Sequence, residues 1–211
     1  MNQDIVNFII LSFWSLFVIV DPVGLVPAFL VMTEHNNIGE KVHVAKIASI
    51  VTFLLLVSFA LGGRWILSIF GISFSAFEIA GGIILLKIAL DMLQAKRTAL
   101  KETPEEQAEG SAKEDIAITP LAVPMLAGPG ALTAVVLLCK QAPNFIYGGI
   151  VIGNIFFVSL ITFLILRLAS YRSTVFSTIS LKIMTRLMGL LLAAIAIQFI
   201  LNGIQKTNVL F

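Results

Sequence analysis

The two halves of this chain of 211 residues repeat each other at a spacing of 107 positions, and this repeat constrains the fold more than any other feature. Positions 21 and 128 differ by 107, and Asp21-Pro22-Val23-Gly24-Leu25 falls on Gly128-Pro129-Gly130-Ala131-Leu132. The same shift places 82–89 on 189–196 without a gap, and Ile72-Ser73 on Ile179-Ser180. Matched prolines and glycines are stronger evidence of a repeat than matched leucines, because leucine-rich stretches often match by chance. A duplicated apolar chain with helix breakers inside its apolar segments is typical of transporters.

Composition places the chain in a lipid bilayer. Of its residues 58% are hydrophobic and 12% are charged, and the mean hydropathy is +1.01, whereas soluble domains carry about 25% charged residues. A spanning helix needs about 20 mostly apolar residues, which predicts six spans, over 5–33, 44–61, 72–94, 117–139, 145–166 and 184–205. The net charge of +2 does not indicate nucleic-acid binding, since most of the basic residues lie in loops beside the membrane.

The basic residues divide unevenly between the two sides of these six spans. One side carries Lys41, Lys46, Lys96, Arg97, Lys101, Lys113, Arg167, Arg172 and Lys182, and the other carries Arg64, Lys140 and Lys206. The positive-inside rule makes the first side cytoplasmic, so both termini are expected on the periplasmic side of a bacterial-type inner membrane. Because each repeat has three spans, the second copy enters from the opposite face. The sequence therefore predicts two inverted three-helix repeats, 1–94 and 117–211, joined by a cytoplasmic linker over 95–116.

Helix breakers interrupt the first and fourth predicted spans. As a continuous helix the first would be about 43 Å long, against about 30 Å for the hydrocarbon core, and it contains Asp21-Pro22-Val23-Gly24-Leu25-Val26-Pro27. The stretch Thr119–Gly130 of the fourth contains three prolines and two glycines. Proline inside a helix costs about 3 kcal/mol or more. These residues either kink the helices or unwind them, and their clustering at equivalent repeat positions favours unwinding.

Unwound backbone inside a bilayer implies a cavity, because its free N–H and C=O groups are tolerated only beside protein or water. A half-helix that begins there directs N–H groups and partial positive charge at an anion such as a carboxylate. A half-helix that ends there offers carbonyl groups to a cation. A zwitterionic amino acid would use both, without a catalytic side chain or a cofactor.

Three carboxylates lie within the predicted spans, and such groups are usually functional. Asp91 is expected to pair with Lys87, four residues before it on the same helix face, which leaves two. Asp21 has three possible roles: a cap for the half-helix that begins at Pro22, a proton or sodium site, or a contact for a substrate ammonium group. Glu78, near the outer end of the third span, is either an interfacial cap or a cavity carboxylate. Both are candidates for ion coupling.

Other polar residues have less specific roles. Ser12, Ser15, Thr133 and Asn154 are small enough to line a cavity, although serine and threonine in membrane helices often bond their own backbone. The two histidines lie in or beside a cytoplasmic loop without an acidic or cysteine cluster, so no metal site is expected.

The two interrupted segments resemble the hallmark motifs of the MarC family of inner-membrane proteins. The resemblance rests on Asp21-Pro22-Val23-Gly24-Leu25-Val26-Pro27-Ala28-Phe29-Leu30, on 120–133, and on the glycine motif Ala80-Gly81-Gly82-Ile83. Similarity to the SnatA-like branch implies transport of small neutral amino acids such as alanine, glycine or serine, at a site formed by the two interrupted helices. The substrate-binding residues that this implies are Asp21, Pro22, Val23, Gly24, Pro124, Gly128, Pro129, Gly130 and Thr133.

The sequence thus predicts an all-α membrane protein that acts as a secondary transporter by alternating access, coupled to H⁺ or Na⁺. The alternatives are a membrane-embedded enzyme and a channel or structural subunit. An enzyme is disfavoured because the chain lacks a constellation of His, Asp, Glu or Ser at one membrane face. The direction of transport and the oligomeric state stay open.

Overall fold

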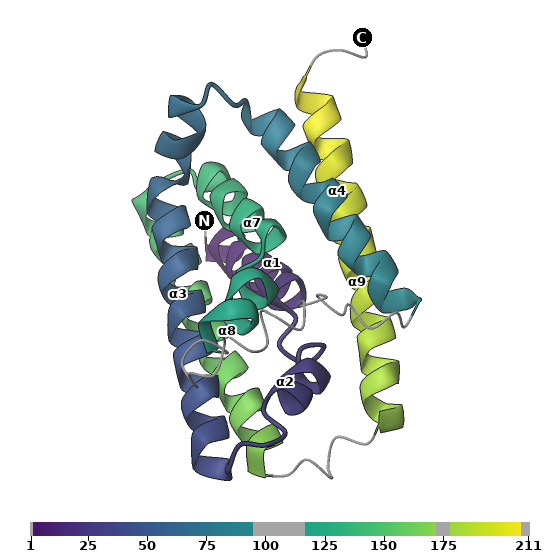
Figure 1. Cartoon of the computed structure of the whole chain (residues 1–211). Coiled ribbons are helices and arrows are strands. Elements are labelled where there is room, and N and C mark those ends of the chain that lie inside the picture. The colour runs from purple at the N-terminus through teal and green to yellow at the C-terminus, as the bar shows by residue number, and fades with distance from the viewer. Residues whose placement is uncertain (1, 95–116, 172–177, 208–211) are drawn as a thin grey trace.

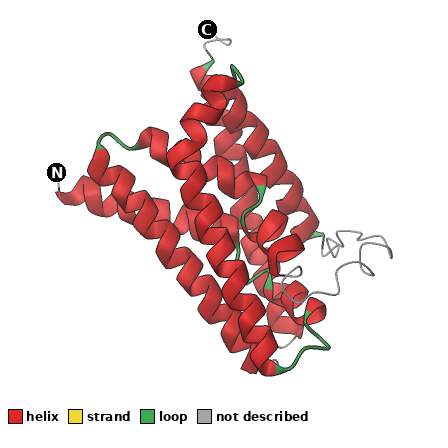
Figure 2. Cartoon of the chain, turned by 60° about the vertical axis from the view of Figure 1, so that its left-hand side comes forward, coloured by secondary structure: helices red, strands yellow, loops and turns green. Residues whose placement is uncertain are grey.

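The computed structural model describes residues 2–94, 117–171 and 178–207 (Figure 1). Every element in these ranges is a helix, and within each range short loops join the helices (Figure 2). The elements are α1 (Asn2–Val20), α2 (Val26–Met32), α3 (Ile38–Ile69), α4 (Phe74–Leu93), η1 (Ala117–Leu126), α7 (Pro129–Gln141), α8 (Phe145–Tyr171) and α9 (Thr178–Lys206). The predicted linker over 95–116 lies outside the described residues.

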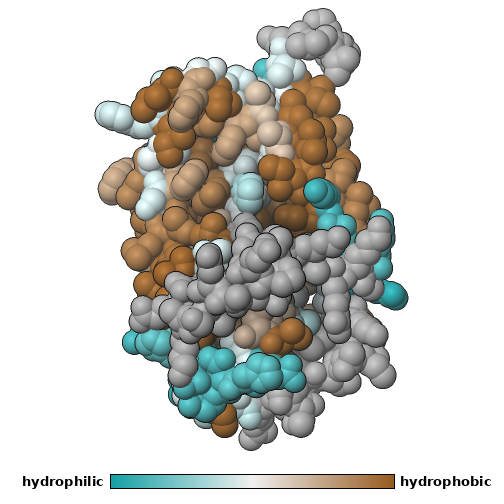
Figure 3. Space-filling model, in the orientation of Figure 1, coloured by the Kyte–Doolittle hydropathy of each residue, from teal (hydrophilic) through white to brown (hydrophobic). Residues whose placement is uncertain are grey.

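Within the part of the chain that the structure describes, three helices are long and apolar enough to cross a membrane: α3, α8 and the part of α9 from Ile183 to Lys206. Each contains one of the predicted spans and extends beyond it. The apolar stretches of α1 and α7 are shorter because each is part of an interrupted segment. α4 has 20 residues but carries three charged side chains. Exposed apolar side chains cover much of the described surface (Figure 3), as expected of an all-helical, multi-pass membrane protein.

The starts of α3 and α8, at positions 38 and 145, are 107 positions apart, which is the spacing found in the sequence. The side chain of Asn37 accepts the N–H of Glu40 at 3.0 Å and so caps α3. Its repeat equivalent, Asn144, accepts the N–H groups of Ile146 at 3.0 Å and of Tyr147 at 3.4 Å. The two helices therefore begin at the same point of the repeat, and for the same reason.

The helices form three layers. α4 packs along α9, α3 packs along α8, and the interrupted segments α1–α2 and η1–α7 lie between these two pairs (Figure 1). Several fully or almost fully buried positions are repeat equivalents of each other: Val44 and Val151, Ala48 and Ile155, Leu85 and Leu192, Ala89 and Ala196. Because the interrupted segments lie between the two helix pairs, they are at the centre of the molecule.

The contact between α4 and α9 is reciprocal. A Cβ added at Gly82 would lie 2.7 Å from the carbonyl oxygen of Ala196, and one added at Gly189 would lie 3.2 Å from that of Ala89. Gly82 and Gly189 are repeat equivalents, as are Ala89 and Ala196. Small residues let the two backbones approach closely, as in other membrane helix pairs.

Gly82→Ala is expected to lower the free energy of unfolding by about 1–3 kcal/mol, the range for overpacked sites. The added methyl group meets backbone of α9, which cannot rotate away as a side chain can. Gly62→Ala is the matched control, because nothing lies within 4 Å of its added Cβ. Thermal unfolding in detergent measures both, and equal melting temperatures would contradict the close packing.

The two interruptions and the adjoining cavity

The first interruption lies between α1 and α2, over residues 21–25. The backbone of Asp21 has a φ of 47°, in the left-handed region that residues other than glycine seldom adopt. Its carboxylate oxygen Oδ1 accepts the N–H of Gly24 at 3.0 Å, and its carbonyl accepts the N–H of Leu25 at 3.2 Å. A Cβ at Gly24 would overlap the Asp21 carboxylate. The side chain of Asp21 therefore caps the unwound turn, and Gly24 makes room for it.

The interruption frees carbonyl groups at the end of α1. In a continuous helix each carbonyl accepts the N–H four residues further on. For Val18 that residue is Pro22, which has no N–H, and for Val20 it is Gly24, whose N–H goes to Asp21 instead. The buried C-terminal turn of α1 thus directs carbonyl oxygens into the break.

The second interruption lies in and after η1. Thr119 and Val123 have extended φ/ψ of −128°/120° and −127°/119°, and the N–H of Ala127 reaches back to the carbonyl of Ala122 at 2.8 Å. Gly128 is the N-cap of α7, with a ψ of 170°. Unwinding, predicted in preference to simple kinks, is therefore observed in both segments, on the described backbone.

Equivalent prolines shape the two interruptions. Pro129 is the repeat equivalent of Pro22, so the carbonyl of Met125 loses its helical donor as the carbonyl of Val18 does. Pro22 is buried, whereas Pro129 is exposed at the start of α7. The backbone of Pro124 belongs to η1, and its side chain is outside what the structure describes.

The first turn of α7 packs against α4. A Cβ at Gly130 would overlap Leu85, and one at Gly81 would overlap Thr133. The hydroxyl of Thr133 is buried and donates to the carbonyl of Pro129 at 2.8 Å, the self-bonding expected of threonine in a membrane helix. These two predicted site residues therefore fix α7 on α4 in this structure.

The C-terminal end of α1 and the N-terminal end of α7 lie at the same level of the bundle. α1 runs parallel to α8, since the ring of Phe8 packs on Tyr147 at 5.0 Å and the side-chain amide of Asn154 donates to Ser12 Oγ at 2.7 Å. α7 runs the opposite way, because a connection of three residues, 142–144, turns the chain from α7 into α8. The end of α1 and the start of α7 thus meet at the interruptions.

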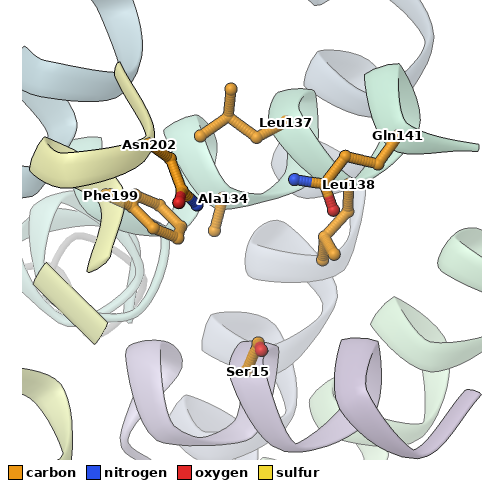
Figure 4. Close-up of a pocket in the computed structure, with 7 residues that line it drawn as sticks. All are labelled: Ser15, Ala134, Leu137, Leu138, Gln141, Phe199 and Asn202. Atoms are coloured by element: carbon orange, nitrogen blue, oxygen red, sulfur yellow. The ribbon is translucent and has the colours of Figure 1, made fainter. Parts of the chain in front are cut away.

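A cavity of about 160 Å³ opens between α1, α7 and α9 (Figure 4). Four apolar residues and three with neutral polar side chains line it: Ala134, Leu137, Leu138 and Phe199, and Ser15, Gln141 and Asn202. Ser15 lies five residues before the end of α1, and Ala134 five residues after the start of α7. At about 1.5 Å per residue, the interruptions lie about 8 Å deeper in the bundle.

Sequence reasoning identified Ser15 as a possible cavity residue but missed the amides of Gln141 and Asn202. The amide oxygen of Asn202 accepts from Gln198 at 2.7 Å. Gln198 and Asn202, spaced four residues apart in the otherwise apolar stretch 187–204 of α9, are a signal that could have pointed to this surface.

Glu78 lies near the N-terminal end of α4, and the predicted linker follows the opposite end of this helix. Its side chain is 1% exposed, and Lys206 at the end of α9 donates to both carboxylate oxygens, at 2.8 and 3.1 Å. The structure therefore gives Glu78 a lysine partner on the neighbouring helix. Among the described residues, no cluster of His, Cys, Asp and Glu is suited to a metal ion.

Comparison with known proteins connects this arrangement to a family. Residues 6–208 match the family described as MarC family integral membrane protein. A UPF0056 membrane protein of Methanocaldococcus jannaschii is 42% identical, over 94% of this chain and 97% of its own length. A second from Pyrococcus horikoshii is 39% identical over 97% and 98%, and a third from Escherichia coli is 34% identical over 92% and 90%. These names describe membrane proteins and do not give an activity. No solved structure matches the chain.

Proposed function

Since the chain belongs to the MarC family of integral membrane proteins, we propose that it is a secondary transporter of small neutral amino acids that works by alternating access. One observation carries the proposal. Two unwound segments at equivalent repeat positions meet in the middle of the bundle, directly below a small neutral cavity. Such paired interruptions are typical of transporters whose substrate site lies near the bilayer midplane.

The contact between α4 and α9 supports an inverted repeat. Glu78 pairs with Lys206, and Gly189 packs against Ala89, so the two helices are antiparallel. A reciprocal contact between antiparallel equivalent helices is what a twofold axis perpendicular to them produces. For helices that cross a membrane, this axis lies in the membrane plane. We assign one repeat to residues 1–94 and the other to 117–211.

The size and polarity of the cavity support the substrate class. An engineered protein cavity of about 150 Å³ holds benzene, which has six heavy atoms, as alanine has. The cavity lining contains hydroxyl and amide groups but no charged side chain, so a molecule without net charge fits it. In the interruptions below, the start of α7 directs N–H groups toward a carboxylate, and the end of α1 directs carbonyls toward an ammonium group.

We assign the substrate site to both interruptions and the coupling ion, H⁺ or Na⁺, to Asp21. Glu78 is the second candidate for coupling, but Lys206 already neutralises it. The excess of basic residues at the α2–α3 end of the bundle supports a cytoplasmic location for that end. Both termini would then face the outside of the cytoplasmic membrane.

Transport by the purified protein in proteoliposomes tests this function. We expect radiolabelled alanine, glycine or serine to enter the vesicles with saturation, and unlabelled substrate inside to accelerate the exchange. Imposed proton and sodium gradients identify the coupling ion. Protein-free vesicles and a large cationic amino acid, lysine, are the controls. If none of the three amino acids moves under any gradient, the substrate class is wrong, and transport without saturation would indicate a channel.

A further inference from the structure

The cavity between α1, α7 and α9 has repeat equivalents elsewhere in the chain. It lies toward the end of the bundle that carries Lys206 and the α7–α8 connection, called here the upper end. A shift of 107 positions carries its lining residues to positions toward the opposite end, called the lower end, where α2 meets α3. The equivalents are Ala122 for Ser15, Pro27 for Ala134, Leu30 for Leu137, Val31 for Leu138, Glu34 for Gln141 and Met92 for Phe199. The equivalent of Asn202 lies outside the described residues.

The centre of the equivalent surface, at Ala122, is packed in the present structure. Ala122 is completely buried, whereas its equivalent Ser15 is partly exposed. Leu30 and Met92 are half-buried against the apolar core, and Val31 and Glu34 are exposed. The equivalents of all these lower-end residues line the upper cavity. The two halves therefore share a sequence pattern and the close contact of α4 with α9, but they differ in whether the centre of this surface, at Ser15 or Ala122, is open.

A duplicated chain can exchange these two arrangements between its halves. The starts of α3 and α8 and the close contact of α4 with α9 are already alike in both halves. Movement of the interrupted segments relative to these pairs would close one surface and open the other with contacts of the same kind. Related states of this sort commonly differ by a few kcal/mol, so that the minor one is populated at about 0.1–10%.

We propose that a second cavity opens at the lower end when the upper cavity closes, lined by Ala122, Pro27, Leu30, Val31, Glu34 and Met92. It admits the same small solute from the other side of the membrane, and in this respect it rests on the proposed function. The linings of the two cavities differ at two polar positions, and Ala122 of the lower cavity lacks the hydroxyl group of Ser15. Gln141 of the upper cavity is neutral, whereas Glu34 gives the lower cavity a carboxylate.

Cysteine labelling from each side of the membrane tests the second cavity. Cys139 is first replaced by alanine, and a single cysteine is then introduced at Ser15, Ala122 or Ala48. Ala122 and Ala48 are both completely buried, but the repeat equivalent of Ala48, Ile155, does not line the cavity. A membrane-impermeant maleimide is applied to right-side-out and to inside-out vesicles. Size-exclusion profiles and melting temperatures check that each variant is folded.

We expect Ser15→Cys to react from one side only and Ala122→Cys from the other side only. Ala122→Cys should react about 10- to 1000-fold more slowly than Ser15→Cys, in line with the population of the minor state, and faster than Ala48→Cys. Reaction of Ala122→Cys from the same side as Ser15→Cys, or no faster than Ala48→Cys, would overturn the proposal.

The labelling result is independent of the substrate. If Ala122→Cys reacts from the opposite side but no amino acid is transported, the second cavity stands and the proposed substrate class fails. If alanine is transported but Ala122→Cys reacts no faster than the buried control, the transport function stands and this second cavity is wrong.

Discussion

Gly24→Ala is expected to reduce alanine transport by about 10- to 100-fold, while the protein still folds. The added methyl group would occupy the space of the Asp21 carboxylate, which now accepts the N–H of Gly24 at 3.0 Å. Asp21 must move, and its left-handed backbone loses the hydrogen bond that supports it. Strain of this kind costs about 1–3 kcal/mol, and each 1.4 kcal/mol is a factor of ten in affinity. This strain is expected to weaken substrate binding and so to slow transport, because the interruption forms part of the proposed substrate site.

The matched control is Gly153→Ala, in the middle of α8, where nothing lies within 4 Å of the added Cβ. Initial rates of alanine uptake in proteoliposomes are compared at equal protein content, with the melting temperature measured for each variant. We expect the control to transport as the wild type does. Wild-type uptake by Gly24→Ala would remove this turn from the substrate site.

The sequence predicted the positions of both interruptions because proline and glycine act locally. Pro22 and Pro129 each remove one hydrogen bond whatever surrounds them. The extent of the first break was predicted less well. The predicted motif runs to Pro27, but α2 already begins at Val26, because proline is tolerated in the first turn of a helix, where its missing N–H is not needed.

The cavity and the ion pair could not be predicted, because each joins segments that are far apart in the chain. Ser15 and Asn202 line one cavity from α1 and α9, and Glu78 meets Lys206 across 128 positions. A polar residue in an apolar helix shows that a partner is needed but does not identify it. Thr133 illustrates the opposite case, since its partner is the carbonyl of Pro129 in its own helix.

Lys206→Met is expected to lower the free energy of unfolding by about 3 kcal/mol. Glu78 is 1% exposed, so without the ammonium group its carboxylate is a buried charge with its lysine partner removed. Breaking a buried ion pair in this way costs about 3–5 kcal/mol. The lower end of the range applies because Lys206 is itself 43% exposed and reaches water. Denaturant unfolding in detergent micelles, followed by circular dichroism, measures the change.

The double variant Glu78→Gln/Lys206→Met separates pairing from ion coupling. Removing both charges leaves no unpaired charge at position 78, so we expect its stability to lie within about 1 kcal/mol of the wild type, as replacement of whole buried pairs is often near neutral. If the pair only joins α4 to α9, the double variant should keep the wild-type dependence of alanine uptake on the proton or sodium gradient. Loss of that dependence in a stable double variant would instead make Glu78 the coupling carboxylate, and Asp21 would be left as the cap of its turn.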